Sequence, residues 1–174
     1  MELDEQAFRQ QLVAMLPRLR RFALSLTGDR AEADDLVQAT CERALARFHQ
    51  WRPDSRLDRW LFAILHHLFI DERRSVRRRK PHLPFEEERL FARARNTMKN
   101  IEARLQLGEV AQAMRQMTEN DRMVLSLVCV EGMSYRDAAA IMQVPVGTVM
   151  SRLARARKKL HGLIHGKEKG GPKA

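Results

Sequence analysis

The sequence predicts an all-α protein with two small helical domains, a helical bundle and a helix-turn-helix domain, joined by a flexible linker. Three observations favour this fold class. Gly (8) and Pro (6) are few among the 174 residues, aromatic residues make up 6%, and the helix formers Ala, Leu, Arg and Glu are abundant. Apolar residues recur at helical spacing before and after residues 81–100, where the pattern weakens. Residues 131–160 have the pattern of two short helices joined by a tight turn.

The first predicted domain, residues 1–80, begins with a long amphipathic helix. Apolar residues follow helical spacing from Phe8 to Leu26. Pro17 either kinks this helix or starts a fresh one. We expect Gly28 to end it, because glycine accepts the left-handed conformation that commonly follows a helix.

The second predicted helix, about residues 31–48, follows Asp29 as its N-cap. One side of this helix collects Asp34, Asp35, Gln38 and Glu42. In so basic a chain, this acidic patch would suit docking onto a basic protein surface. Composition alone favours a plainer interpretation, a solvated face with acidic residues near a helix N-terminus.

A loop at residues 49–55 precedes the third predicted helix, about residues 57–79, with Asp54 or Ser55 as its cap. His66 and His67 point to different sides of this helix, and we expect both on a polar surface and not in a metal site. The helix ends in a basic run made of Arg73, Arg74, Arg77, Arg78, Arg79 and Lys80. Capping a helix C-terminus needs fewer cations than this, so the run predicts a surface that follows phosphates.

Residues 81–104 form the predicted linker, and the second predicted domain covers residues 105–165. Helical periodicity returns from Ile101, and Thr118 caps a helix over about residues 119–130. Residues 166–174 have the composition of a disordered basic tail.

The helix-turn-helix begins with a helix over residues 135–142, capped by Ser134. Pro145 closes the turn because it cannot lie inside a continuing helix. The last helix runs from near Val146 to near Leu160, and its apolar stripe is made of Val149, Leu153, Ala156 and Leu160. The opposite face carries Thr148, Ser151, Ala154, Arg155 and Lys158, flanked by Arg152 and Lys159. Such a helix is typical of those that enter the DNA major groove, although a solvated basic helix without a ligand has the same pattern.

Net charge and cysteine content narrow the class of protein. The chain has 32 Lys and Arg against 22 Asp and Glu, a formal charge of +10, which favours a polyanionic partner. Cys41 and Cys129 lie in apolar or helical contexts, and we expect each to be a small buried residue. No zinc-ligand spacing, signal peptide or membrane-length apolar run is visible. The sequence therefore predicts a soluble cytoplasmic protein without a metal or another cofactor.

Three segments together resemble bacterial RNA polymerase sigma factors of the extracytoplasmic-function (ECF) group, in the sigma-70 family. EGMSYRDAAAIMQVPVGTVMSRLARARKKL at residues 131–160 is similar to the family's region 4.2. AEADDLVQATCERAL at residues 31–45 is similar to region 2.2, and WLFAILHHLFIDERR at residues 60–74 is similar to regions 2.3 and 2.4. The resemblance covers nearly the whole chain, and the three motifs occur in the family's order.

The resemblance implies an initiation factor that brings core RNA polymerase to promoters, recognises the −35 and −10 elements and helps to open the duplex. It implies contact with the clamp helices of the polymerase β′ subunit through Asp34, Asp35, Leu36 and Gln38. For the −35 element it implies Thr148, Ser151, Arg152, Arg155, Lys158 and Lys159. For the −10 element it implies Trp51, Arg52, Ser55, Trp60, His67, Arg73, Arg74 and Arg77.

Further partners implied by the resemblance are the flap of the polymerase β subunit and an anti-sigma factor. Members of the family have no catalytic residues of their own. Two positions depart from the family: Met150 stands where relatives usually carry Lys or Arg, and His67 where many carry Asn. Both departures bear on the preferred promoter sequence.

Two other classes of protein compete with this interpretation. A stand-alone helix-turn-helix regulator would bind duplex DNA tightly by itself, at a palindromic site. A small hydrolase using Cys41 or Cys129 would need a nucleophile signature, which the sequence lacks.

Overall fold

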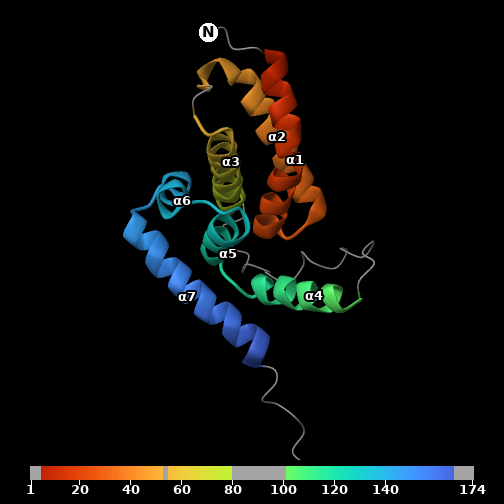
Figure 1. Cartoon of the computed structure of the whole chain (residues 1–174), viewed down its shortest axis with the longest axis vertical. Coiled ribbons are helices and arrows are strands. Elements are labelled where there is room, and N and C mark those ends of the chain that lie inside the picture. Colours follow the sequence, from red (N-terminus) through yellow and green to blue (C-terminus); the bar gives the residue numbers. More distant parts are fainter. Residues whose placement is uncertain (1–4, 53–54, 80–100, 167–174) are drawn as a thin grey trace, which may run out of the picture.

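The computed structural model describes residues 5–52, 55–79 and 101–166, and Figure 1 shows their arrangement. The described residues are helical, with short connections and no strand. Three predictions lie outside the described residues: the linker at 81–100, the tail from 167 and the Asp54 cap. We refer to residues 5–79 as the first module and to residues 101–166 as the second module.

The first module contains α1 (Glu5–Thr27), α2 (Arg30–Ala46), a short 3-10 helix η1 (Phe48–Gln50) and α3 (Leu57–Arg79). Helix α1 is continuous through Pro17, so no second helix starts there. Gly28 has φ 72°, the left-handed conformation expected after α1. The Asp29 side chain accepts a hydrogen bond from the Glu32 backbone amide at 3.0 Å, which confirms it as the cap of α2.

The second module contains α4 (Ile101–Arg115), α5 (Glu119–Leu125), the π-helical turn η2 (Ser126–Val130), α6 (Tyr135–Met142) and α7 (Val146–His165). Thr118 caps α5 as expected, accepting a hydrogen bond from the Asp121 amide at 3.2 Å. Helix α7 continues past Leu160 to His165. Leu163 packs against the core there, so the apolar stripe extends further than expected.

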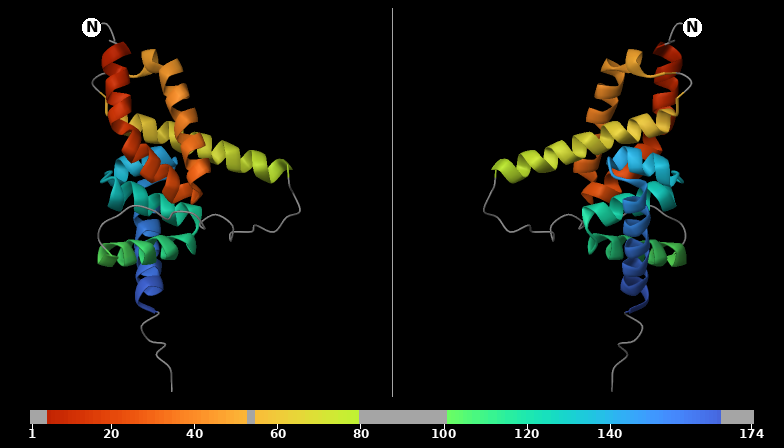
Figure 2. Two further views of the ribbon diagram at one scale, coloured as in Figure 1. Left: turned by 90° about the vertical axis from the view of Figure 1, so that its right-hand side faces the viewer. Right: turned by 90° about the vertical axis from the view of Figure 1, so that its left-hand side faces the viewer.

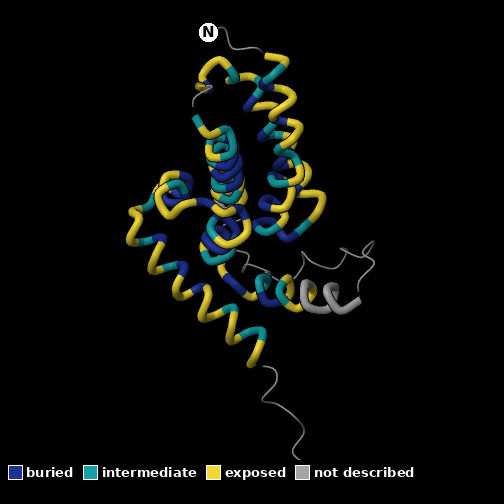
Figure 3. The backbone as a smooth tube through the Cα atoms, in the orientation of Figure 1, coloured by how far each residue is buried: buried dark blue, intermediate teal, exposed yellow. Residues whose placement is uncertain are grey.

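One apolar cluster runs through both modules (Figure 3). In the first module, α1 contributes Phe8 and Phe22, and the rings of Phe22 and Phe62 meet edge to face at 5.1 Å. In the second module, Leu127 and Val149 are fully buried. Because the cluster is continuous, the two modules are packed against each other.

The modules meet where α5, η2 and α6 of the second module pack against α1 and α3 of the first. Helix α6 lies against α3, and α5 lies against α1, as the views from both sides show (Figures 1 and 2). The C-terminal part of α3 projects beyond the packed helices (Figure 2). The sequence predicted two bodies on a tether and did not reveal that they pack together.

Candidate nucleic-acid interface

The helix-turn-helix is formed by α6, a short turn and α7. Ser134 caps α6 by accepting a hydrogen bond from the Asp137 amide at 3.0 Å. The chain then turns at Gln143, whose backbone adopts the left-handed conformation with φ 54°. Pro145 follows as the residue immediately before α7, where its missing amide hydrogen has no consequence. The cap, the left-handed turn residue and the proline together fix the orientation of α7 relative to α6.

Helix α7 has one buried stripe and one exposed polar face. Val149, Leu153 and Ala156 are buried, which confirms the apolar stripe. The exposed face carries Ser151, Arg155, Lys158 and Lys159, while Thr148 and Arg152 are half-buried at its edge. The Ser151 hydroxyl donates to the Thr148 carbonyl at 3.1 Å, and Arg155 Nε lies 3.4 Å from the Ser151 carbonyl. Both side chains lie along the surface of their own helix and are accessible to a ligand.

A shallow hollow lies between this face and the start of α5. It is lined by Thr118, Asn120, Asp121, Arg152, Arg155 and Lys159. The three basic side chains concentrate positive charge in this hollow. Such a positively charged hollow is suited to binding a phosphate group. No sequence pattern associates Thr118 and Asn120 with this face, because 32 residues separate Asn120 from Arg152 in the chain.

The acidic patch of α2 is exposed in the first module. Asp34, Asp35, Gln38 and Glu42 all face solvent. The Gln38 amide donates to Glu42 at 3.0 Å, and Asp34 forms an ion pair of 3.2 Å with Arg20. Leu36, by contrast, is 3% exposed and packs in the core. Its side chain therefore anchors α2 and does not face an external partner.

The two tryptophans of the first module belong mainly to the core. Trp51 is 6% exposed, and its ring lies 5.4 Å from that of Phe8. Trp60 is half-buried, and its ring also lies near Phe8, with the ring centres 6.1 Å apart. Trp51 thus offers no open ring face for stacking a base, although the sequence placed it among the −10 residues. The apolar pocket next to α1 explains the difference, since a large ring gains most from burial there.

Of the other −10 candidates, Arg52, His67 and Arg74 are exposed and Ser55 is half-buried. The Ser55 hydroxyl donates to the Arg52 carbonyl at 2.7 Å. His67 Nε2 lies 2.8 Å from the side-chain nitrogen of Gln143. The side chain of Arg77 lies outside the described residues.

Arg73 is a −10 candidate that is already engaged. Its side chain is 20% exposed and forms an ion pair with Glu119 of the second module, Nε to Oε1 at 3.1 Å, without hydrogen-bond geometry. A second, longer pair of 3.9 Å joins it to Glu32. The guanidinium lies 5.1 Å from the centre of the Phe69 ring.

Two expectations about single residues are wrong. His66 is buried and does not lie on a polar surface. Burial lowers its pKa to about 4, and the neighbouring His67 has a smaller effect in the same direction. Cys129 is exposed, because it lies near the end of η2, with Arg157 Nη2 3.5 Å from its sulfur. Cys41 is half-buried, and burial raises the pKa of its thiol. Within the described ranges, no three His, Cys, Asp or Glu side chains gather as a metal ion requires.

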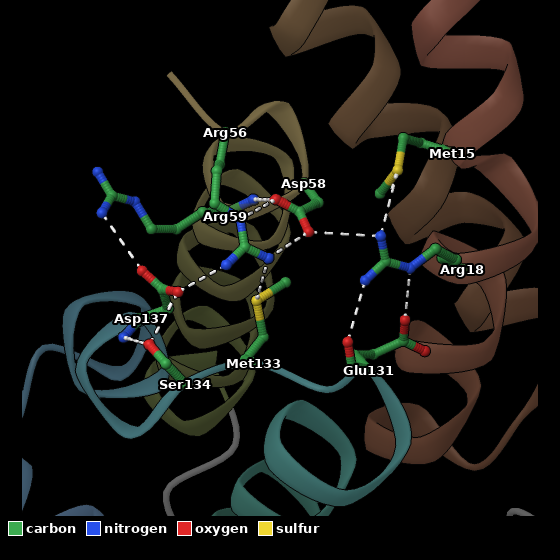
Figure 4. Close-up of polar contacts among 9 residues, drawn as sticks. All are labelled: Met15, Arg18, Arg56, Asp58, Arg59, Glu131, Met133, Ser134 and Asp137. Carbon is green, nitrogen blue, oxygen red and sulfur yellow. Dashed lines mark hydrogen bonds and ion pairs between the residues drawn. The ribbon is translucent and has the colours of Figure 1, made fainter. Parts of the chain in front are cut away.

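A network of charged side chains joins the two modules (Figure 4). Glu131, whose side chain is 0% exposed, accepts hydrogen bonds of 2.8 Å from Nε of both Arg18 and Arg21. Asp137 accepts a hydrogen bond of 2.9 Å from Arg56 and one of 3.4 Å from Arg59. No local sequence pattern predicts this network, because its partners lie 78 to 113 residues apart.

Asp58 connects the two halves of this network within the first module. It accepts hydrogen bonds from Arg56 at 2.8 Å and from Arg18 at 3.4 Å. Burial raises the pKa of the Asp58 carboxyl, but hydrogen bonds from Arg56 and the Arg59 amide outweigh this and lower the pKa overall. Asp58 is therefore ionised at neutral pH and orients the arginines that face the second module.

Comparison with known proteins identifies the family. The model for the Sigma2 domain of PhyR matches residues 12–66, and the model for sigma-70 region 4 matches residues 107–160. The chain is 39% identical over 168 residues to the ECF RNA polymerase sigma factor EcfG of Rhodopseudomonas palustris strain TIE-1, covering 95% of this chain and 91% of the relative. The chain belongs to the ECF RNA polymerase sigma factors.

Other relatives of this sigma factor agree. The ECF RNA polymerase sigma factor SigM of Bacillus subtilis strain 168 is 30% identical over 146 residues, 83% of this chain and 87% of that protein. The solved sigma factor RpoE in complex with the anti-sigma factor NepR, from Bartonella quintana, superposes with a TM-score of 0.76 at 31% identity, over 91% of this chain and 97% of that one. CnrH in complex with the cytosolic domain of CnrY gives a TM-score of 0.67 at 28% identity, over 94% and 90%.

As an ECF sigma factor, the chain directs RNA polymerase in transcription initiation, and its helix-turn-helix belongs to the DNA-binding region 4. The region 2 match falls on α1 to α3 and the region 4 match on α4 to α7, in agreement with the all-α fold in two regions. The stand-alone regulator is not favoured. Along the described part of the sigma factor, every helix is too short or too polar to cross a bilayer.

Proposed function

We propose that this sigma factor divides its work among three surfaces. Helix α2 docks on core polymerase, the exposed face of α7 recognises the −35 element, and α3 with the loop before it takes the −10 element. One observation carries this division: the acidic patch of α2 and the basic face of α7 are both exposed, lie in different modules and have no residue in common. Each surface can therefore be removed without touching the other.

The acidic patch of α2 supplies the contact with the β′ clamp helices. Asp34, Asp35 and Gln38 are the contacting side chains, while buried Leu36 holds the helix in place. In a chain of net charge +10, an exposed anionic surface selects a basic protein partner and repels the DNA that the rest of the chain attracts. The flap of the β subunit would hold the second module.

On α7, Ser151 and Arg155 read base edges of the −35 element. An arginine that makes two hydrogen bonds to guanine contributes about 1–3 kcal/mol of discrimination against other bases. Thr148, Arg152, Lys158 and Lys159 hold phosphates, which sets the register of the helix on the duplex without reading sequence. The hollow at Thr118 and Asn120 accommodates one of these phosphates.

In the first module, Arg52, Ser55 and His67 face the −10 element as a single strand. Arg73, Arg74 and Arg77 hold its phosphates. Extruding a base from the stack costs a few kcal/mol, which these contacts offset. Trp51 and Trp60 support this surface from the core and shape it, without stacking on a base.

We further propose that an anti-sigma factor regulates this chain in the bacterial cytoplasm, since the similar sigma factor RpoE was solved in complex with the anti-sigma factor NepR. The working units are region 2 at residues 1–80, a linker at 81–104, region 4 at 105–165 and a tail at 166–174. The chain contributes no catalytic residue and no cofactor, because polymerase carries the chemistry.

Run-off transcription with purified core polymerase on a promoter library tests the division of labour. Arg155→Ala should lose −35 discrimination while binding of core polymerase persists. Asp35→Ala combined with Gln38→Ala should lose binding of core polymerase. Binding of −35 DNA through the exposed face of α7 should remain unchanged in this variant. Glu109→Ala, an exposed residue of α4 outside these surfaces, serves as the control. Equal loss of the same function in both variants would show the division to be wrong.

A further inference from the structure

Helix α7 begins with two exposed apolar side chains. Val146 is its first residue and is 38% exposed, and Met150, one turn later, is 52% exposed. With 3.6 residues per turn, side chains four positions apart lie within about 40° of each other around the helix. Val149 and Leu153, the apolar residues that face the core, are buried. Val146 and Met150 therefore form a separate apolar flank of α7, which a partner can cover with a gain in free energy.

Gly147 lies between the two and lowers the surface of the helix there. A Cβ atom added to Gly147 would meet no atom within 4 Å, so packing inside the protein does not call for a glycine. Its backbone is helical and has no positive φ, so conformation does not call for one either. Glycine is also used where another molecule approaches the backbone closely. Gly147 thus indicates that a ligand approaches the first turn of α7.

The apolar flank borders the surface that we propose for the −35 element. At about 100° per residue, Ser151 lies between Met150 on one side and Arg152 on the other. Arg152 belongs to the basic hollow, which is suited to a phosphate. The first turns of a recognition helix are the part that contacts base edges, and this end of α7 lies beside α6 at the edge of the molecule (Figure 1). The apolar flank is therefore placed to meet bases.

The chemistry of the major groove limits what an apolar flank can recognise there. The C5-methyl group of thymine is the one apolar group that base edges present in this groove. The other groups are hydrogen-bond donors and acceptors, which a valine or methionine side chain would cover without giving them a partner. An apolar flank consequently favours base pairs that contain thymine and disfavours G·C pairs.

We propose that Val146 and Met150 are specificity-determining residues that contact thymine methyl groups in the −35 element, beside the bases contacted by Ser151 and Arg155. Gly147 lets the edge of the base pair come close to the helix. This inference rests on the proposed −35 function of α7. It adds a preference for A·T pairs next to the base pairs that the polar side chains recognise.

Replacing thymine by uracil tests the contact, because uracil pairs with adenine in the same way and lacks only the C5-methyl group. The full chain is bound to core polymerase, and the probe is a promoter duplex selected from a library randomised in the −35 element. Each thymine of this element, on either strand, is replaced singly by deoxyuridine. We expect at least one replacement to weaken binding of the holoenzyme about fourfold, as the loss of one buried methyl group predicts.

Variants of the flank then show which side chain contacts the methyl group. At the sensitive position, Met150→Ala or Val146→Ala should bind the thymine and the uracil duplex equally well. Val13→Ala changes an exposed apolar residue of α1 outside the DNA surfaces and should keep the fourfold difference. Thermal unfolding establishes that each variant is folded.

Four results would overturn the proposal. They are selection of a −35 element without an A·T pair, equal binding of thymine and uracil at every position by the unmodified holoenzyme, and a thymine preference that persists in both flank variants. The fourth is weaker assembly of Met150→Ala with core polymerase at an unchanged thymine preference, which would assign the flank to a protein partner. In each case, loss of −35 discrimination in Arg155→Ala would show that the proposed function of α7 still stands.

Discussion

At the scale of single residues, His66 shows how burial sets the charge of a side chain. It is 7% exposed in α3, and its Nδ1 atom is buried without a hydrogen-bond partner among the described residues. Burial lowers its pKa from 6.5 to about 4, with a smaller contribution from His67. The folded protein therefore holds His66 neutral at pH values where the unfolded chain would protonate it.

This shift makes the stability of the fold depend on pH. Because the folded pKa lies below the unfolded pKa, stability is complete above about pH 6.5 and falls as the pH drops toward 4. From about pH 7.5 to pH 5, His66 should cost about 2 kcal/mol of unfolding free energy. His66→Leu should flatten this part of the profile in urea unfolding, whereas His161→Gln, an exposed residue of α7, should leave it unchanged. A profile with the same slope in His66→Leu would contradict the assignment.

Met150 is a large apolar side chain exposed on α7. It is 52% exposed and lies next to Ser151. Met150→Lys should strengthen duplex DNA binding for all sequences and steepen the dependence of log K on log salt by about 0.9 for one added phosphate contact. Filter binding at several salt concentrations measures both effects. Val13→Lys, at a somewhat more exposed position on α1, should leave the slope nearly unchanged.

At the scale of elements, α1 accommodates a proline within its interior. Pro17 cannot donate the backbone hydrogen bond that a helical residue would donate, yet α1 runs from Glu5 to Thr27 without a break. The apolar residues on either side, such as Leu12 and Leu19, are buried and hold the helix together. Tertiary packing has overridden a strong local signal for a helix end.

Replacing this proline tests that explanation. Pro17 is exposed, so Pro17→Ala removes little packing while restoring one backbone donor. We expect the free energy of unfolding to rise by about 1–3 kcal/mol, as helix propensities indicate. Urea unfolding at neutral pH gives the value. A decrease would mean that the ring of Pro17, or its effect on the unfolded chain, matters more than the missing hydrogen bond.

At the scale of the whole molecule, the continuous core and the buried Glu131 couple the two modules. We expect the chain to unfold in one calorimetric transition. Glu131→Lys would bury a cation next to Arg18 and Arg21, a change that typically costs about 3–5 kcal/mol. It should therefore separate the modules and split the transition in two. Glu5→Lys, exposed at the start of α1, should keep a single transition, and two transitions in the unmodified chain would contradict the coupling.

Helices and their ends were the most predictable part of this molecule. The caps Asp29, Thr118 and Ser134 each accept a hydrogen bond from the amide three residues later, so a short stretch of sequence contains the whole signal. The exposed face of α7 was predictable for the same reason, because the helical spacing of apolar and polar residues repeats within this one helix. Burial of Trp51 and His66 was not predictable in this way, because it depends on what other helices bring to the same place.

The boundary between the modules was the least predictable part. Glu131 is a single acidic residue in a turn, and its partners Arg18 and Arg21 are two of the four arginines in α1. Nothing local distinguishes them from solvated surface charges. Only the packing of α5 against α1 brings them together, and that packing depends on apolar residues from both ends of the chain.

The wide turn η2 also determines where Glu131 points. The Glu131 amide donates to the Ser126 carbonyl, five residues earlier, at 2.8 Å. A π turn contains one residue more than the α turn it replaces, and each residue of an α-helix rotates the next by about 100°. Loss of a single codon from this turn, for instance that of Val128, would rotate Glu131 and the entire helix-turn-helix away from α1. A change in chain length by one residue would thus uncouple the modules while every side chain at their boundary stays the same.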